Sequence, residues 1–204
     1  MDTTRQHRDD RDMLKSTRDM ETTVKTHAIT VAEFGRMVEA GVYGPKDRIE
    51  LIDGQLIDVP PQGSPHMGTL TRFEHRFRAF GTLALVRGQG PLPVAIDSQP
   101  EPDIALVRWN DRFYVDAHPT VEDTYAVVEI AYTSLQFDRG VKRRVYGAAG
   151  IPEYWIIDVV AGAIEVYREP HELGYASPTV FQRGQSVAFA AFPDIVFTVD
   201  ELLG

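Results

Sequence analysis

Glu129 stands inside the apolar run of residues 125–131, YAVVEIA, whose composition predicts a buried strand. Strand alternation places Val127, Glu129 and Ala131 on one face. Burying an unpaired carboxylate is costly, so Glu129 must pair with a cation, take up a proton or bind a metal ion. An internal salt bridge explains this residue as well as a functional role does. Glu129 is therefore a candidate that needs a second carboxylate beside it.

Asp103 supplies that second carboxylate. It opens the strand-like run of residues 103–109, DIALVRW, directly after residues 99–102, QPEP, whose two prolines hold the approach extended. Taken alone, an aspartate after a proline is more typical of a turn or a cap. Mg²⁺ is commonly held by one or two carboxylates together with water and substrate phosphate oxygens. Asp103 and Glu129 on adjacent strands therefore predict a site for Mg²⁺ or Mn²⁺.

A basic segment follows the second strand. Asp138, Lys142 and Tyr146 are spaced by one helical turn and line one side of a helix predicted over residues 138–149. A surface Asp–Lys pair would explain the first two, at a few tenths of a kcal/mol. A lysine beside two carboxylates would instead orient an attacking water and stabilise charge in a transition state. We therefore take Lys142 as a candidate catalytic residue and Tyr146 as a candidate substrate contact.

Four further residues have weaker signals. Glu50 lies among apolar neighbours in the sequence RIELIDG, and is as well explained by an edge strand as by an additional acid of the site. His66 lies at a predicted helix start, where we favour capping or solvation of the imidazole over a phosphate contact. Arg143 and Arg144, with His66, are candidates for contacts with flanking phosphates.

The elements that must position these residues can be read from periodicity and turn signals. Asp53-Gly54 predicts a tight hairpin turn, and Ser64-Pro65 predicts a helix cap with its first helical position. Helices are predicted over 31–40, 64–84 and 138–149. Strands are predicted over 48–59 as a hairpin, then over 93–97, 103–109, 125–131, 153–160 with 163–169, and 178–182 with 185–190, before a last strand and half turn within 194–203. This order predicts an α/β or α+β domain with one central mixed sheet.

Composition limits the partners. The chain has 204 residues and a formal net charge of -9. Residues 1–25 hold six basic and six acidic side chains and are neutral overall. The net negative charge therefore belongs to residues 26–204, which hold 15 basic and 24 acidic side chains. We interpret residues 1–25 as a mobile tail and residues 26–204 as a single domain. An acidic domain does not bind nucleic acid through counterion release, so a phosphate partner must meet a local basic patch or a bound cation.

Other classes of protein are disfavoured. Cysteine is absent, which excludes disulfides and thiolate chemistry. No apolar stretch is long enough to span a bilayer, and the charged first residues do not resemble a secretory signal. We therefore expect a cytoplasmic protein with no membrane partner, and the sequence leaves open whether two copies pair.

The sequences IELIDG, EPD, VVEI, S-x-x-x-D-x-x-x-K-x-x-x-Y and GIPEYWIID together resemble the Uma-type family of restriction-endonuclease-like proteins, within the PD-(D/E)XK nuclease superfamily. The resemblance runs from about Val31 to the C-terminus. It implies a restriction-endonuclease-like core with a central mixed sheet flanked by helices, Asp103 and Glu129 as metal ligands, and Glu50 as the acid of the first motif. The superfamily places a lysine two residues after the strand glutamate, where this chain has Ala131. Lys142 is then the candidate for the displaced lysine.

These features predict a Mg²⁺- or Mn²⁺-dependent endonuclease that hydrolyses DNA. Asp103 and Glu129 would bind the metal ion, and Lys142 would position the water. A catalytically degenerate binding or regulatory module with the same fold is the main alternative. A metal hydrolase acting on a small phosphorylated compound is a third possibility.

Overall fold

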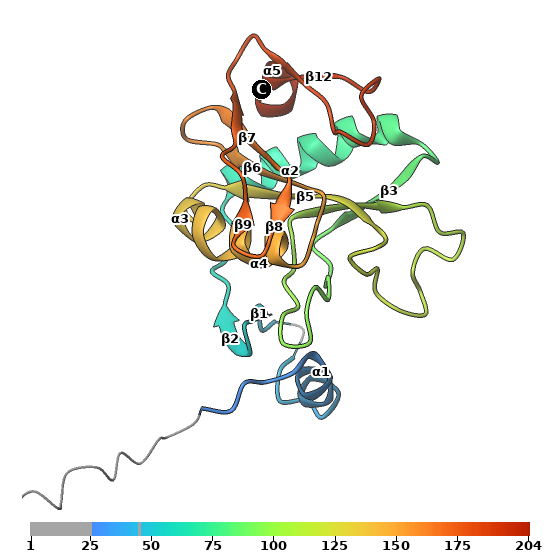
Figure 1. The fold of residues 1–204 in the computed structure, drawn as a ribbon, viewed down its shortest axis with the longest axis vertical. Coiled ribbons are helices and arrows are strands. Elements are labelled where there is room, and N and C mark those ends of the chain that lie inside the picture. Colours follow the sequence, from blue (N-terminus) through green and yellow to red (C-terminus); the bar gives the residue numbers. More distant parts are fainter. Residues whose placement is uncertain (1–25, 45) are drawn as a thin grey trace, which may run out of the picture.

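The computed structural model describes residues 26–44 and 46–204, so the predicted tail of residues 1–25 lies outside the described residues. Figure 1 shows the elements arranged around a central sheet, with α1 and the β1–β2 hairpin together at one end. The helices are α1 (Val31–Glu39), α2 (Ser64–Phe77), α3 (Leu135–Phe137), α4 (Arg143–Ala148) and α5 (Val199–Leu203), with a 3₁₀ turn η1 (Arg78–Phe80) and a π-helical turn η2 (Asp138–Lys142).

The described part of the chain forms a six-stranded mixed sheet. Only β5 and β6 run parallel within it, and the other neighbours are antiparallel. Its strands in spatial order are β10 (Thr179–Phe181), β7 (Ala163–Arg168), β6 (Glu153–Asp158), β5 (Thr124–Ala131), β4 (Ile104–Arg108) and β3 (Ala84–Gly88). The predicted central mixed sheet flanked by helices is confirmed.

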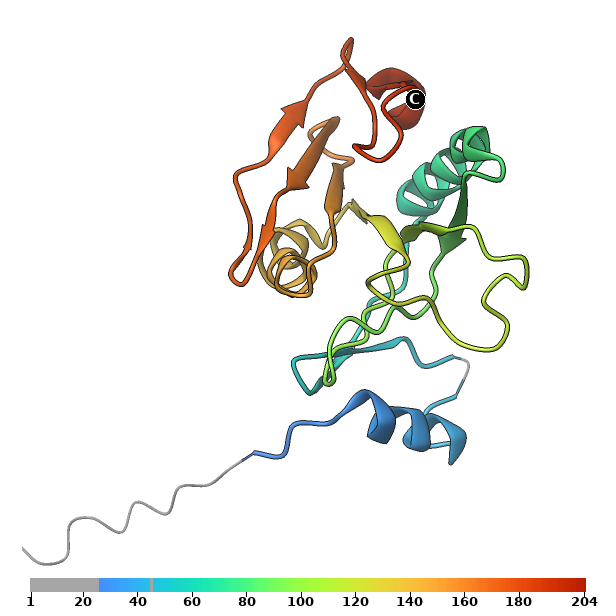
Figure 2. The ribbon, with the colours of Figure 1, turned by 45° about the vertical axis from the view of Figure 1, so that its right-hand side comes forward.

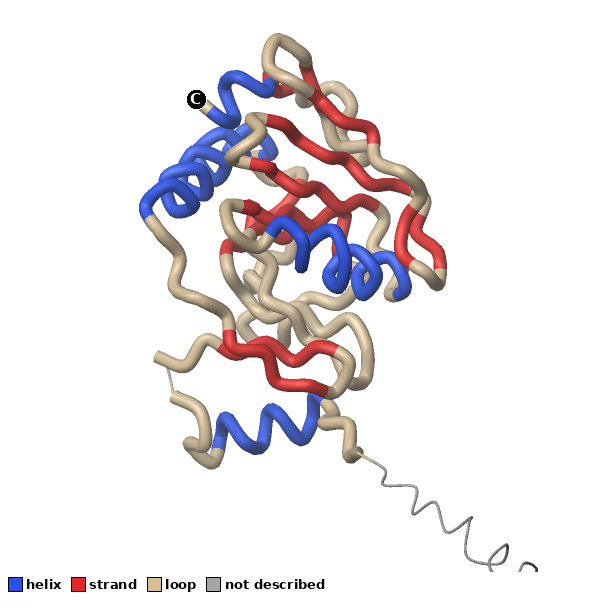
Figure 3. The backbone as a smooth tube through the Cα atoms, turned by 90° about the vertical axis from the view of Figure 1, so that its left-hand side faces the viewer, coloured by secondary structure: helices blue, strands red, loops and turns tan. Residues whose placement is uncertain are grey.

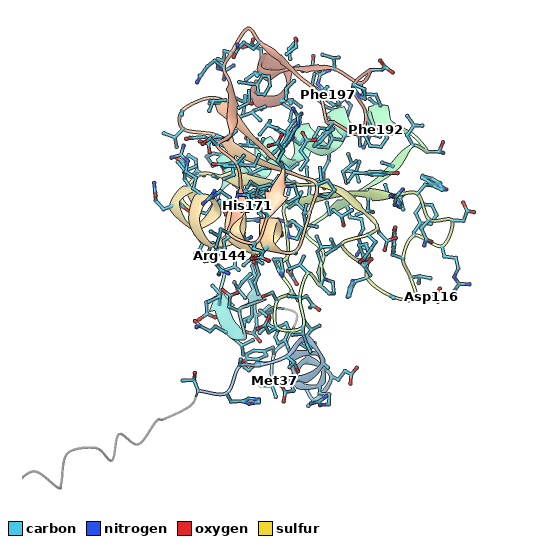
Figure 4. The ribbon with its side chains drawn as sticks, in the orientation of Figure 1. Met37, Asp116, Arg144, His171, Phe192 and Phe197 are labelled. Atoms are coloured by element: carbon cyan, nitrogen blue, oxygen red, sulfur yellow. The ribbon has the colours of Figure 1, made fainter. Side chains whose placement is uncertain are left out.

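The two faces of the sheet carry separate apolar clusters. On one face, Val128, Ile130 and Trp155 pack with α2 and α5. This layer includes Phe197 and Phe192, whose rings lie 5.3 Å from Phe77 and 5.2 Å from Phe80 (Figure 4). On the other face, Val127 and Ile156 pack against α4. Figure 2 shows the sheet between the α2 layer and the α4 layer. Because β5 alternates, Glu129 points to the α4 side.

The first hairpin lies outside the main sheet. β1 (Ile49–Ile52) and β2 (Gln55–Asp58) pair around Asp53 and Gly54, whose φ angles of 50° and 71° confirm the predicted tight turn. The amide of Gln99 donates to the carbonyl of Leu51 at 2.7 Å, which ties β1 to the segment that leads to Asp103. Figure 3 shows this hairpin and α1 stacked below the sheet. The hairpin therefore brings its own side chains to the start of β4.

Several predicted elements differ from the structure. The helix cap is Gly63 and not Ser64, and α2 ends at Phe77, so the apolar spacing that continued to residue 84 crosses into β3. Residues 93–97 make only an isolated bridge, because prolines flank them. The predicted hairpin over 178–182 and 185–190 does not form as such. Instead β10 joins β7, while β11 (Ser186–Val187) pairs with β12 (Phe197–Thr198).

The helical segment after β5 begins at Leu135, three residues before the predicted start, and contains the π-helical turn η2. A π turn inside a helix is rare and often marks a functional site. Here it holds Asp138 and Lys142 in the interior, where each is less than one-tenth exposed. The small strands β8 (Pro170–His171) and β9 (Gly174–Tyr175) form a hairpin that packs against α4.

Candidate metal-dependent active site

The strand register brings Asp103 and Glu129 together. Ile104 lies opposite Val128 in the antiparallel pair of β4 and β5, so Asp103 comes to lie beside Glu129. The amide of Asp103 lies 3.4 Å from Glu129 Oε2, and the amide of Ile130 donates to Asp103 Oδ2 at 2.8 Å. Asp103 and Glu129 are 6% and 3% exposed. Two acids that are 26 residues apart in the chain thus share one pocket.

Lys142 lies between two of the carboxylates. Its Nζ donates to Glu129 Oε1 at 2.9 Å and to Glu50 Oε1 at 3.1 Å. Tyr146, one turn further along the helix, donates its hydroxyl to the same Glu129 Oε1 at 2.8 Å. Both donors therefore engage one oxygen of Glu129, and the other oxygen, Oε2, faces Asp103. The helical spacing of Lys142 and Tyr146 explains why they reach the same atom.

The charges in this pocket are strongly coupled. Burial raises the pKa of Glu129 well above its usual value, although the ammonium of Lys142 opposes this. Burial alone would lower the pKa of Lys142, but Glu129, Glu50 and Asp138 together raise it well above its usual value. Lys142 therefore keeps its proton at every physiological pH. It acts as a fixed positive charge and a hydrogen-bond donor, and it cannot accept a proton as a general base.

Residues in α2 and just before it also bind the carboxylate of Asp103. His66 Nε2 lies 3.0 Å from Asp103 Oδ1, and the Gln62 side-chain amide donates to the same oxygen at 3.1 Å. Gln89 in turn donates to Gln62 Oε1 at 2.6 Å. His66 is 8% exposed and lies in the first turn of α2. Its observed contact is therefore with a carboxylate of the site, where the sequence suggested a cap or a phosphate contact.

The acids line a cleft of about 540 Å³. Residues of β2, of the segment 59–63 and of the segment 132–138 line it, and Asp103, Glu129 and Glu50, each less than one-tenth exposed, form its base. Asp138 also lines it and accepts a hydrogen bond from the Ser134 hydroxyl at 2.6 Å. Burial raises the pKa of Asp138 to about 6, against the opposing effects of Lys142 and Ser134.

The donor set of the cleft suits a hard divalent cation. Glu50 is 4% exposed, and its Oε2 has no hydrogen-bond partner among the described residues. A buried carboxylate oxygen without a partner is costly, and a cation is the partner that would satisfy it. The acids of the lining offer carboxylate oxygens, which Mg²⁺ and Mn²⁺ prefer as ligands. Within residues 26–44 and 46–204, however, no three side chains of metal-binding type already stand at ligand spacing. Water and substrate oxygens would have to complete the coordination.

The structure places three predicted substrate contacts elsewhere. Arg143 donates to the carbonyls of Arg139 and Tyr175, on the β9 side of α4. Arg144 pairs with Asp53 at the tip of the first hairpin (Figure 4). Tyr146 is fully buried behind Glu129. None of the three lines the cleft, so contacts of Arg143 and Arg144 with flanking phosphates and of Tyr146 with substrate stay predictions.

Some residues of the cleft were not identified from the sequence. Asp138 was recognised only as a member of a helical stripe, although the four-residue spacing of Ser134 and Asp138 is compatible with their contact. Gln62 and Tyr132 line the cleft from irregular segments, which have no periodicity that could reveal them. Glu101 lies between two prolines and lines the cleft as well. Burial, followed by repulsion from Glu50, raises its pKa.

Comparisons with known proteins identify the family and the fold of the chain. Residues 31–200 match the Uma2 family, described as "Putative restriction endonuclease". A crystal structure of a protein from Anabaena variabilis, titled a putative nuclease belonging to DUF820, is similar with a TM-score of 0.66 and 16% sequence identity, over 86% of this chain and 97% of that chain. At that identity the likeness concerns the fold. A search of curated proteins found no match. In the part of the chain that the structure describes, every helix is too short or too polar to cross a membrane. Because the family match covers most of its length, this chain belongs to the Uma2 family of restriction-endonuclease-like proteins.

Proposed function

We propose that this protein is an endonuclease that uses Mg²⁺ or Mn²⁺ to hydrolyse phosphodiester bonds in DNA. The observation that carries the proposal is the convergence of Asp103, Glu129 and Lys142 in one cleft, from two strands and a helix that are far apart in the sequence. The family to which the chain belongs supports a nuclease. Buried acids whose pKa values are shifted, gathered in a cleft, are typical of catalytic sites.

Each residue has a defined task in this proposal. Asp103 and Glu129 would hold the cation, and Glu50 Oε2 is available as a further oxygen. The cation would supply Lewis-acid polarisation of the phosphoryl oxygen and would acidify an attacking water. Lys142 fixes Glu129 and presents positive charge to the cleft, while His66 and Gln62 fix Asp103. Fixed groups of this kind need no reorganisation as charge develops on the phosphate.

One observation favours the alternative of a binding module that has kept the fold without turnover. Lys142 already occupies hydrogen-bonding positions on both Glu129 and Glu50, so it neutralises the acids that would otherwise attract a cation. In this alternative the cluster is a buried ion network and the cleft binds a ligand that needs no metal ion. Cation binding therefore separates the two functions.

The test incubates the purified protein with plasmid DNA and with single-stranded DNA in the presence of Mn²⁺, beside the variants Glu129→Ala and Asp194→Asn. Asp194 is exposed and distant from the cleft in sequence and structure, so its variant controls for the loss of one acid. Nicking that needs the metal ion, persists in Asp194→Asn and disappears in Glu129→Ala supports the nuclease. Absence of cleavage together with absence of Mn²⁺ binding by calorimetry supports the binding module.

A further inference from the structure

Part of the lining of the cleft is apolar, in contrast to its buried acids. Ile57, Val59, Pro60 and Pro61 come from β2 and the segment after it, and Tyr132 and Phe137 come from the segment after β5. Tyr132 is 47% exposed. It follows the end of β5 directly, three residues after Glu129. A half-exposed aromatic ring thus lines the same cleft as the acids and belongs to neither apolar core.

The charges of the cleft do not suit a duplex. Among the described lining residues, Arg48 and Lys142 are the permanent cations, and Lys142 is buried and paired. The acids of the lining are Glu50, Asp58, Glu101, Asp103, Glu129 and Asp138. Proteins grip duplex DNA mainly through Arg and Lys contacts to phosphates, which supply much of the affinity. This cleft has few such contacts to offer, so its affinity must come from another source.

The volume of the cleft also disfavours a duplex. A volume of about 540 Å³ lies in the range of sites for one small molecule, roughly 300–1,000 Å³. A nucleotide fits such a space, whereas a stacked duplex does not. Enzymes that act in narrow pockets on nucleic acid take a single strand or extrude a nucleotide from the helix. Stacking of a base on an aromatic ring is tolerant of sequence and contributes about 1–3 kcal/mol per base.

We propose that the cleft is a subsite for single-stranded DNA, in which a base next to the cleaved phosphate stacks on Tyr132 among the apolar residues of the lining. The inference rests on the proposed nuclease function and defines its substrate class. Tyr132 is a specificity-determining residue in this arrangement, because an intact duplex keeps its bases stacked and cannot present one to the ring. Binding should depend weakly on salt, with a log–log slope of about −0.7 to −1.4, as expected for one or two phosphate contacts on a single strand.

The test compares one short oligonucleotide carrying 2-aminopurine, as a single strand and as a duplex, mixed with the full chain and Mg²⁺. Quenching of 2-aminopurine within the first seconds reports stacking before cleavage, and later samples report cleavage. We expect the parent to bind and cut the single strand at least about tenfold better than the duplex. Tyr132→Ala should weaken single-strand binding by about 5- to 100-fold, which matches the loss of one stacked base.

Two variants control the experiment. Tyr132→Phe keeps the ring and should bind like the parent. Phe113→Ala removes a 63% exposed ring from the loop after β4, at the opposite end of that strand from Asp103, and should also leave binding unchanged. Equal binding of duplex and single strand, or parental binding by Tyr132→Ala, would overturn the inference. Ring-dependent quenching without cleavage of either oligonucleotide would instead overturn the nuclease and leave the subsite supported.

Discussion

Lys142 has the most constrained side chain of the site. The residue is 6% exposed, and its ammonium contacts Glu129 and Glu50, with Asp138 as a third acid that raises its pKa. Such a group is costly to bury alone, and its partners are costly to bury without it. Whatever chemistry takes place in the cleft, Lys142 contributes a charge whose position and protonation are fixed. It therefore serves both the stability of the fold and the electrostatics of the site.

Lys142→Met should lower the free energy of unfolding by about 3–5 kcal/mol, because it leaves two buried carboxylates without their cation. Adding Glu129→Gln to Lys142→Met should recover part of this loss, since the double variant buries one charge fewer. Urea unfolding of the two single variants and the double variant measures the coupling. Additive losses would show that the pair contributes nothing beyond its separate side chains.

Asp138→Asn should change how stability depends on pH. The pKa of Asp138 is 3.8 in the unfolded reference and about 6 in the fold, so the folded state holds this proton more tightly. The parent is therefore most stabilised by this group below pH 3.8, and loses up to about 3 kcal/mol as pH rises through 6. The asparagine variant lacks this loss. Urea unfolding at pH 4 and pH 7 should show that the free energy of unfolding of the variant, relative to that of the parent, is larger at pH 7.

The exposed variant Asp194→Asn is the matched control for Asp138→Asn, since it removes an acid that lies outside both apolar clusters and the cleft. Its stability relative to the parent should be the same at both pH values. A difference between Asp138→Asn and the parent that is also independent of pH would contradict the assignment of a raised pKa to Asp138.

At the scale of elements, the helical segment from Leu135 to Ala148 is what aims Lys142 and Tyr146 at Glu129. The segment is fixed from behind by the β8–β9 hairpin, where Gly147 of α4 approaches Gly174 closely. A Cβ on Gly147 would lie 2.1 Å from the carbonyl oxygen of Gly174. Glycine is therefore required at residue 147 by the packing of two backbones, and the position of the catalytic candidates depends on it.

Gly147→Ala should destabilise the protein by about 1–3 kcal/mol, because the added methyl group must push α4 away from β9. The shift also moves Tyr146, so any cleavage activity should fall with it. Gly140→Ala is the control in the same segment, since a Cβ there meets nothing within 4 Å. That variant should be neutral or up to about 1 kcal/mol more stable. Thermal unfolding distinguishes the two substitutions.

At the scale of the whole molecule, side chains from four parts of the fold line the cleft. The first hairpin contributes Glu50, the main sheet contributes Asp103 and Glu129, α2 contributes His66, and the helical segment contributes Lys142. With Asp138 from the same helical segment, acidic side chains from three separate parts of the fold lie close together, and Lys142 is the buried cation among them. A bound divalent cation would relieve the repulsion among these acids and join the hairpin to the sheet.

Mn²⁺ should accordingly raise the melting temperature, and EDTA should reverse the effect. At 100 times its dissociation constant a cation that binds only the folded state stabilises it by about 2.7 kcal/mol. Glu129→Ala should lose this increase, whereas Tyr132→Ala should keep it, because Tyr132 supplies no charge to the base of the cleft. A melting temperature that does not respond to Mn²⁺ in the parent would favour the buried ion network of the alternative function.

Much of the architecture follows from local patterns in the sequence. The helix predicted over 31–40, the turn at Asp53-Gly54 and the apolar run of β5 each depend on neighbouring residues, and all three occur as predicted. Predictions were wrong where pairing with residues distant in the sequence determines the structure. Residues 179–181 have a strand pattern, but they pair with β7 and not with the segment that follows them. Residues 93–97 have apolar side chains, yet prolines leave them without a continuous ladder.

For the site, the local sequence shows which buried acids need a partner. Glu129 is an acid in an apolar strand and Asp103 an acid at the start of another, so each needed a partner wherever the chain placed it. The partners themselves depend on the tertiary structure. The register of β4 and β5 places Asp103 beside Glu129, and the helical segment places Lys142 between Glu129 and Glu50. Packing against β9 turns Arg143 away from the cleft. The physical reason is that the desolvation cost of a charge depends on the residue and its immediate neighbours, whereas the contact that offsets it depends on how separate layers of the fold pack.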